Sequence, residues 1–261
     1  MVISLGIPLD ENSSYLRGAA LAPQKIRDAY HSDSANYCTE NGIDLSKDNR
    51  WKDVGDLTLS SMPHAFAEIE NAIASHLDQG NNVFSLGGDH SITYPIIKAF
   101  ARKYPKLTIL HLDAHGDLYN DFEGNKFSHA CPFARIMEEG LAQRLIQVGI
   151  RTYNPHQREQ VKRFGVEVVE MKDWNDSIQF QFDGPVYLSL DLDALDPAFV
   201  PGVSHHEPGG FSTRQVLSII QNLKANLVGA DLVELNPTRD IQNVTAMVAA
   251  KLFKEILVKM F

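Results

Sequence analysis

The chain has 261 residues, of which 44% are hydrophobic and 22% are charged, as is ordinary for a globular protein. Its formal net charge of −9 and its lack of basic tracts argue against a nucleic-acid or membrane partner, and no apolar run approaches the roughly 18 residues of a membrane span. The chain has two cysteines, Cys38 and Cys131, and its N-terminus lacks a basic leader followed by a long apolar segment. We therefore expect a cytoplasmic protein without structural disulfides.

Short apolar runs and helical periodicity alternate along the chain. Strands are expected at residues 2–7, 83–86, 107–112, 145–150, 166–170, 186–190 and 227–235, and helices at 23–30, 63–77, 95–104, 131–139, 155–164, 212–223 and 241–258. Residues 32–53 are polar and aperiodic, so we expect them to be irregular. Ser212, with Gln215 three positions later, is expected to cap its helix. The alternation predicts a parallel sheet covered on both faces, in a single domain over residues 1–261.

Three residues with metal-binding side chains follow the strand at 107–112. Asp113, His115 and Asp117 stand at alternate positions, so in an extended chain their side chains leave the strand end on one side. Two carboxylates and an imidazole repel or desolvate one another there unless a cation lies between them. A solvated turn is the alternative interpretation, and metal binding is the one that we favour.

Two other strand ends carry the same residue types. His90 follows the strand at 83–86, and Asp191 and Asp193 follow the strand at 186–190. Because ligands of open parallel sheets bind outside the carboxyl ends of the strands, we expect these side chains in one crevice with those after residue 112. A single divalent ion rarely takes so many anionic ligands, so the sequence predicts two ions that share bridging carboxylates.

Three motifs resemble the signatures of the ureohydrolases, the family of arginases, agmatinases, formimidoylglutamases and other guanidino-acid hydrolases. The motifs are Gly87-Gly-Asp-His-Ser, Asp113-Ala-His-Gly-Asp and Ser189-Leu-Asp-Leu-Asp-Ala-Leu-Asp-Pro. The resemblance extends from the first strand to the last helix. It implies a three-layer α/β/α sandwich around a parallel sheet of about eight strands, two Mn²⁺ ions per chain and a homotrimer or homohexamer.

The resemblance also implies roles for individual residues. A hydroxide that bridges the metals would attack a guanidinium carbon to give urea and an amine, and Asp117 would orient it. His129 would protonate the leaving amine, although a surface-loop histidine is the commoner interpretation without the family context. Glu234 would hold the guanidinium, and Asp231 is interpreted as a residue that supports the site. The first ion would be bound by His90, Asp113, Asp117 and Asp191, and the second by His115, Asp113, Asp191 and Asp193.

The substrate-reading positions depart from the arginase pattern. Arginases carry an Asn and an Asp that read the amino-acid head group, and the matching residues here are Tyr119 and Asn154. His205 and Glu207 lie in a loop that could either reshape the pocket, with Glu207 holding a distal amine, or be solvated. The motif loops contain few cations, which favours an agmatine-like substrate that has cationic groups at both ends and no carboxylate.

We therefore predict a manganese-dependent agmatinase, with arginase, formimidoylglutamase or another guanidino-acid hydrolase as alternatives. A protonated His205 or Arg151 could receive a substrate carboxylate instead, although Arg151 is more readily interpreted as a structural ion-pair partner. The alternative from a different class is a non-catalytic, metal-binding regulatory homologue. The presence of His129 and Glu234 argues against it, since such a protein needs no proton shuttle.

Overall fold

The computed structural model describes residues 1–261 and contains one sheet of eight strands in the order β2-β1-β3-β8-β7-β4-β5-β6. Every pair of neighbouring strands is parallel. The strands are β1 (Val2–Gly6), β2 (Trp51–Asp56), β3 (Asn82–Leu86), β4 (Thr108–Leu112), β5 (Arg144–Ile150), β6 (Glu167–Glu170), β7 (Pro185–Asp191) and β8 (Asn226–Val233). All residues of β1 and β4 are buried, as expected of strands covered on both faces.

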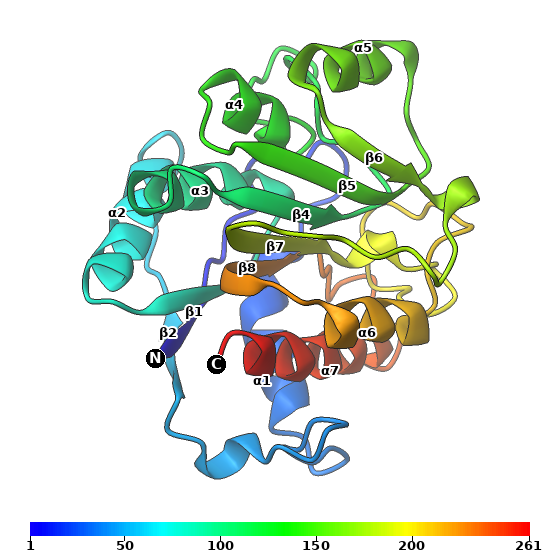
Figure 1. Ribbon diagram of the computed structural model, residues 1–261. Helices are drawn as coiled ribbons and strands as arrows, with labels where there is room; N and C mark the ends of the chain where they lie inside the picture. The colour runs from blue at the N-terminus through cyan, green and yellow to red at the C-terminus, as the bar shows by residue number, and fades with distance from the viewer.

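Helices cover both faces of this sheet (Figure 1). One layer contains α2 (His64–Asp78), α3 (Thr93–Lys103), α4 (Pro132–Glu138) and α5 (Pro155–Phe164), and the other contains α1 (Ala22–Tyr30), α6 (Thr213–Asn222) and α7 (Val244–Lys259). Each layer packs on the sheet through its own apolar core, with Phe84 and Phe253 in one core and Phe100 and Tyr187 in the other. The predicted three-layer α/β/α sandwich is thus confirmed. None of the helices has the length and apolar character needed to cross a membrane.

Two elements differ from the sequence prediction. Strand β2 overlaps the segment 32–53 that was expected to be irregular, and none of its residues is fully buried because it is an edge strand. Without a buried face it lacks the apolar run that marks the other strands. Helix α7 begins at Val244 rather than at residue 241, because Gln242 and Asn243 have φ angles of 51° and 61°, outside the right-handed helical region.

The sheet order explains where the site lies. Strands β3 and β4 are consecutive in the sequence but lie on opposite sides of β8 and β7, which makes the centre of the sheet a topological switch point. The carboxyl ends of these four central strands therefore meet at one edge of the sheet. The segments that follow them carry the predicted ligands.

Candidate metal centre and substrate pocket

Three predicted carboxylate ligands surround the imidazole of His90, which follows β3. Its Nδ1 atom is 3.2 Å from Oδ2 of Asp113 and 3.2 Å from Oδ2 of Asp117. The same atom is 3.1 Å from Oδ2 of Asp191. Because His90 and Asp113 are almost completely buried, the carboxylates meet where water cannot screen their charges.

The hydrogen bonds of His90 show that this cluster fits a cation. Ser189 donates its hydroxyl proton to Oδ1 of Asp231, whose Oδ2 atom accepts from Thr93 and Tyr187. Because that proton is used, the contact of 2.9 Å between Ser189 Oγ and Nε2 of His90 requires the ring to donate. In the neutral ring, the buried Nδ1 atom, which has no hydrogen-bond partner, then carries a lone pair that faces three carboxylates. This arrangement is repulsive unless a cation lies between them.

A second group of predicted ligands forms around His115. Its Nδ1 atom is 3.0 Å from Oδ2 of Asp193 and 3.4 Å from Oδ1 of Asp113. Asp113 therefore contacts both histidines, as a bridging carboxylate would. Asp191 approaches this group through its Oδ1 atom, which accepts the backbone N–H of Asp193 at 2.8 Å. The structure records no contact between Asp191 and His115, so the bridging role of Asp191 stays a prediction.

Burial and the charges of neighbouring carboxylates shift the pKa values of His90 and Asp191. Burial alone would lower the pKa of His90, but Asp113, Asp117 and Asp191 outweigh it and raise the pKa well above its ordinary value. Burial, followed by the charges of Asp193 and Asp113, raises the pKa of Asp191 well above its ordinary value. The cluster thus has more buried negative charge than its own histidines can neutralise, and a bound cation would relieve the excess.

Two residues of the site have strained backbones. Asp117 has a φ angle of 48° and Glu234 has one of 67°, in the left-handed region that non-glycine residues rarely adopt. Each such residue costs about 1–3 kcal/mol and persists where the surrounding structure fixes it, often at a functional site. Because the backbone of Glu234 is left-handed, β8 ends at Val233, two residues before the predicted end at residue 235.

A pocket of about 170 Å³ opens above the cluster. The predicted residues that line it are His115, Asp117, Tyr119, His129, Asp191, Asp193, His205 and Glu234, and it also contains Ser14, Phe122, Ala130, Thr152 and Gln157. His90 and Asp113 lie buried beneath this lining. Asn154 and Glu207, which were expected to contact substrate, do not line the pocket.

His129 lies between Glu234 and the N-terminal loop. Its Nδ1 atom is 2.8 Å from Oε1 of Glu234, while Ser14 approaches Nε2 with its backbone N–H at 3.1 Å and its hydroxyl at 2.8 Å. A neutral ring can accept from the Ser14 amide and a protonated ring can donate to the Ser14 hydroxyl, so Ser14 supports both forms. Burial alone would lower the pKa of His129, but Glu234 outweighs it and raises the pKa to about 9.

Glu234 retains one free carboxylate oxygen. Its Oε1 atom accepts from the backbone N–H of His90 at 2.8 Å as well as from His129, whereas Oε2 has no recorded partner. A guanidinium could therefore donate to Oε2 alone. In this conformation Glu234 would therefore hold a guanidinium through one carboxylate oxygen.

Asn154 supports a pocket residue instead of contacting substrate. Its Oδ1 atom caps α5 by accepting the backbone N–H of Gln157, so its Nδ2 atom is the donor to the hydroxyl of Tyr119 at 2.6 Å. The Tyr119 hydroxyl accepts this bond and keeps its own proton free to donate. The predicted substrate contact of Asn154 is therefore corrected to a positioning contact with Tyr119.

Arg151 and Glu207 also differ from their predicted roles. The carbonyl of Glu207 accepts from Nε and Nη2 of Arg151 at 3.0 and 2.6 Å, which holds this loop against the end of β5. Arg151 further donates to the carbonyls of Asp193 and Leu195, and none of its recorded bonds is to a carboxylate. The ion-pair interpretation of Arg151 is wrong, because the guanidinium binds backbone carbonyls and braces the loops around the metal cluster.

Several residues of the site were not predicted from the sequence. Ser14 lies in a polar loop that gives no signal by itself, and Asp89 holds that loop by accepting from the backbone of Asn12 at 3.1 Å. His111 and Gln147 are completely buried in β4 and β5. A histidine inside the apolar run at 107–112 was a usable signal, because a buried polar group needs a partner.

Comparison with known proteins finds arginases and agmatinases. The chain is 48% identical to arginase 1, mitochondrial, of Arabidopsis thaliana, over 98% of this chain and 80% of that protein. It is 36% identical to a mitochondrial agmatinase of Gallus gallus, over 97% of this chain and 79% of that protein. The solved structure of an arginase from Medicago truncatula superposes with a TM-score of 0.93 at 43% identity, covering 99% of this chain and 87% of that one.

The same comparison overturns the predicted cytoplasmic location. The Arabidopsis relative is a mitochondrial arginase, so the relatives point to an organelle. The prediction was based partly on the two cysteines, which report whether a compartment is reducing and do not distinguish one reducing compartment from another.

The family is shown by a match over almost the whole chain. The arginase family model matches residues 1–259, in agreement with the three motifs at the ends of β3, β4 and β7. The resemblance to ureohydrolases is thereby confirmed, while the identity of the substrate is not. The chain belongs to the arginase family and is an amidinohydrolase that acts on guanidino compounds.

Proposed function

We propose that this chain hydrolyses L-arginine to urea and ornithine with two Mn²⁺ ions at the base of the pocket. The agmatinase prediction needed a carboxylate for the second cationic end of the substrate, and Glu207 was expected to supply it. Glu207 instead lies outside the pocket. The carboxylates that do line the pocket are all at the metal cluster or beside His129, namely Asp117, Asp191, Asp193 and Glu234.

The upper part of the pocket suits an amino-acid head group. Tyr119 has a free hydroxyl proton, which can be donated to an α-carboxylate. Gln157 also lines the pocket, and its amide oxygen, which is buried and has no hydrogen-bond partner, would have to turn toward the pocket to accept from an α-amine. Arginine has both groups, whereas agmatine has the amine alone. The higher identity to a plant arginase than to an agmatinase supports the same choice.

The proposed metal ligands are those of the two histidine clusters. His90, Asp113, Asp117 and Asp191 would hold one ion, and His115, Asp113, Asp191 and Asp193 the other. Oxygen-rich ligand sets with one imidazole per ion suit Mn²⁺ better than Zn²⁺. When bound, the ions supply a water that is nucleophilic at neutral pH.

The protein side chains provide the remaining steps. The free Oε2 atom of Glu234 accepts from the guanidinium and places its carbon above the cluster. Asp117, which lines the pocket beside His90, accepts a hydrogen bond from the attacking water. His129 holds a proton at Nε2 for the departing amine, while Glu234 and Ser14 fix its ring on both sides.

The substrate is tested by urea release from arginine, agmatine and guanidinobutyrate, measured with and without added manganese. We expect kcat/KM for arginine to exceed that for agmatine by at least about tenfold, or roughly 1.4 kcal/mol of transition-state discrimination. A preference for agmatine would restore the agmatinase prediction, which the absence of a lysine or arginine among the pocket residues favours. Absence of urea from every substrate in the presence of manganese would instead favour a regulatory homologue.

A further inference from the structure

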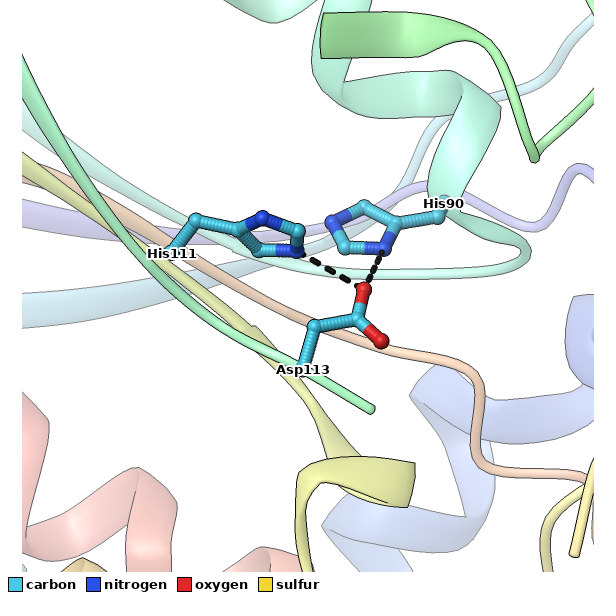
Figure 2. Close-up of side chains that lie close together, drawn as sticks. All are labelled: His90, His111 and Asp113. Atoms are coloured by element: carbon cyan, nitrogen blue, oxygen red, sulfur yellow. Dashed lines mark hydrogen bonds and ion pairs between the residues drawn. The ribbon is translucent and has the colours of Figure 1, made fainter. Parts of the chain in front are cut away.

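His111 is a buried histidine that the proposed chemistry does not use. It lies in β4, two residues before Asp113, and its ring stacks on Phe133 with the centroids 3.9 Å apart. Figure 2 shows the rings of His111 and His90 converging on one oxygen of Asp113. The Nε2 atom of His111 is 2.7 Å from Oδ2 of Asp113 and Nδ1 of His90 is 3.2 Å from it. By distance alone, these three residues could hold a metal ion together.

The neighbouring Gln147 determines which nitrogen of His111 carries the proton. One end of the Gln147 amide lies 2.6 Å from the carbonyl of Gly116, which can only accept a hydrogen bond. That end must therefore be the nitrogen, Nε2. The other end accepts from the hydroxyl of Tyr153 and must be the oxygen. A backbone carbonyl thus fixes the orientation of the amide.

The same amide nitrogen lies 3.0 Å from Nδ1 of His111. Because Gln147 donates there, Nδ1 of His111 must be an acceptor, and the proton of the neutral ring is at Nε2. That proton points at Oδ2 of Asp113. Metal ligation by Nε2 would require this nitrogen to lose its proton and Nδ1 to gain one against the N–H of Gln147. The hydrogen bonds therefore exclude His111 as a ligand in this arrangement.

The bond from His111 orients both oxygens of Asp113. It occupies one lone pair of Oδ2 and leaves the other toward Nδ1 of His90. The Oδ1 atom accepts the backbone N–H of His115 at 2.6 Å and faces the ring of that residue. Held at both oxygens, the carboxylate spans the two ligand clusters and cannot rotate toward one of them alone.

We propose that His111, held by Gln147, is a positioning residue that fixes Asp113 as the carboxylate shared by the two metal ions. The inference rests on the proposed function to the extent that it requires two bound ions. It predicts that manganese affinity depends on a hydrogen-bond donor at the position of Nε2 and does not depend on the imidazole ring itself. Residues that hold metal ligands in this way typically change metal affinity by about 10–100-fold when they are replaced.

The test compares manganese binding by His111→Phe, which removes the donor, with His111→Gln, whose amide can replace it. Calorimetry of metal-stripped protein gives the affinity and the number of ions, and electron paramagnetic resonance reports whether two bound Mn²⁺ ions are coupled. We expect His111→Phe to bind manganese about 10–100-fold more weakly, with altered coupling but two ions at saturation. His111→Gln should recover most of the affinity. Gln147→Met, which leaves His111 free to change its protonated nitrogen, should weaken binding in the same direction.

A matched control is His76→Phe, the same substitution on α2 at a partly buried histidine outside the pocket, and it should bind like the wild type. Wild-type affinity and coupling in His111→Phe would overturn the inference while the metal proposal stands. Loss of one ion at saturation in both His111 variants would also overturn it, because His111 would then be a ligand. A wild-type protein that binds no manganese would overturn the inference together with the proposed metal centre.

Discussion

The base of the pocket and its mouth are built in different ways. At the base, the carboxylates of Asp113, Asp191 and Asp193 are 0–4% exposed and come from the last residue of β7 and from the segments that directly follow β4 and β7. At the mouth, the exposed ring of Tyr15 packs at a tilt against His205, with the ring centroids 5.6 Å apart, although the two residues lie far apart in the sequence. Sheet strands thus place the base, and distant loops assemble the mouth.

This difference separates the chemistry of the site from its selectivity. The base is fixed by parallel pairing of the four central strands and by hydrogen bonds that leave little freedom to Asp113 or His90. The mouth depends on how loops rest on one another, as in the bond from Asn154 to Tyr119. We therefore expect substitutions near the base to reduce turnover and substitutions at the mouth to change substrate preference.

The largest effect on activity is expected from replacing His129, the proposed proton donor near the bottom of the pocket. His129→Asn removes the group that holds a proton for the departing amine, so kcat should fall by on the order of 10²–10⁴-fold. Manganese content should be unchanged, because His129 is not among the proposed ligands. Steady-state kinetics at saturating substrate, with parallel metal analysis, measure both quantities. Near-normal turnover in this variant would show that the amine obtains its proton elsewhere.

The pH profile sharpens this prediction. Glu234 raises the pKa of His129 to about 9, so the protonated form predominates below that pH and is lost as the pH rises through it. We expect kcat to fall with rising pH around 9. Glu234→Gln should move this fall in kcat to lower pH, toward the ordinary histidine pKa near 6.5. If kcat of this variant still falls around pH 9, a group other than His129 titrates there.

The residues that meet at the base of the pocket could be predicted from the sequence, and so could Tyr119 and His205 at its mouth, but the contacts that hold the mouth together could not. His90, Asp113 and Asp191 each follow a strand whose apolar run is visible in the sequence, and parallel pairing brings such ends together. Asn154 before Pro155 is a usual helix N-cap, but no local pattern shows that its Nδ2 atom reaches Tyr119 or that Arg151 binds the carbonyl of Glu207. Those contacts depend on loop conformations, which the spacing of residues does not encode.

Strand β2 was missed for a related reason. An edge strand has one neighbour, and its exposed positions, such as Lys52 and Val54, need not follow an apolar pattern. The buried strands lack this freedom, because both of their faces are covered by helices. Sequence patterns were therefore most informative for the strands that deliver the metal ligands.

The smallest effect is expected at the mouth. Tyr119→Phe removes the hydroxyl proposed to donate to the α-carboxylate, so KM for arginine should rise by up to about tenfold, since a hydrogen bond to a charged group near solvent contributes on the order of 1 kcal/mol. The value of kcat and the metal content should hardly change. The matched measurement with agmatine, which lacks the carboxylate, should show no comparable rise. An equal rise in KM for both substrates would show that Tyr119 does not recognise the head group.

The central claim is that the carboxylates and histidines at the ends of β3, β4 and β7 form a two-ion manganese site that the reaction requires. It is tested most directly by stripping the protein with a chelator, titrating it with Mn²⁺ and following bound metal and urea release from arginine together. We expect about two ions per chain and activity that appears only as the sites fill. Full activity in the metal-stripped protein would contradict the account, and so would the absence of bound manganese at the highest Mn²⁺ concentration.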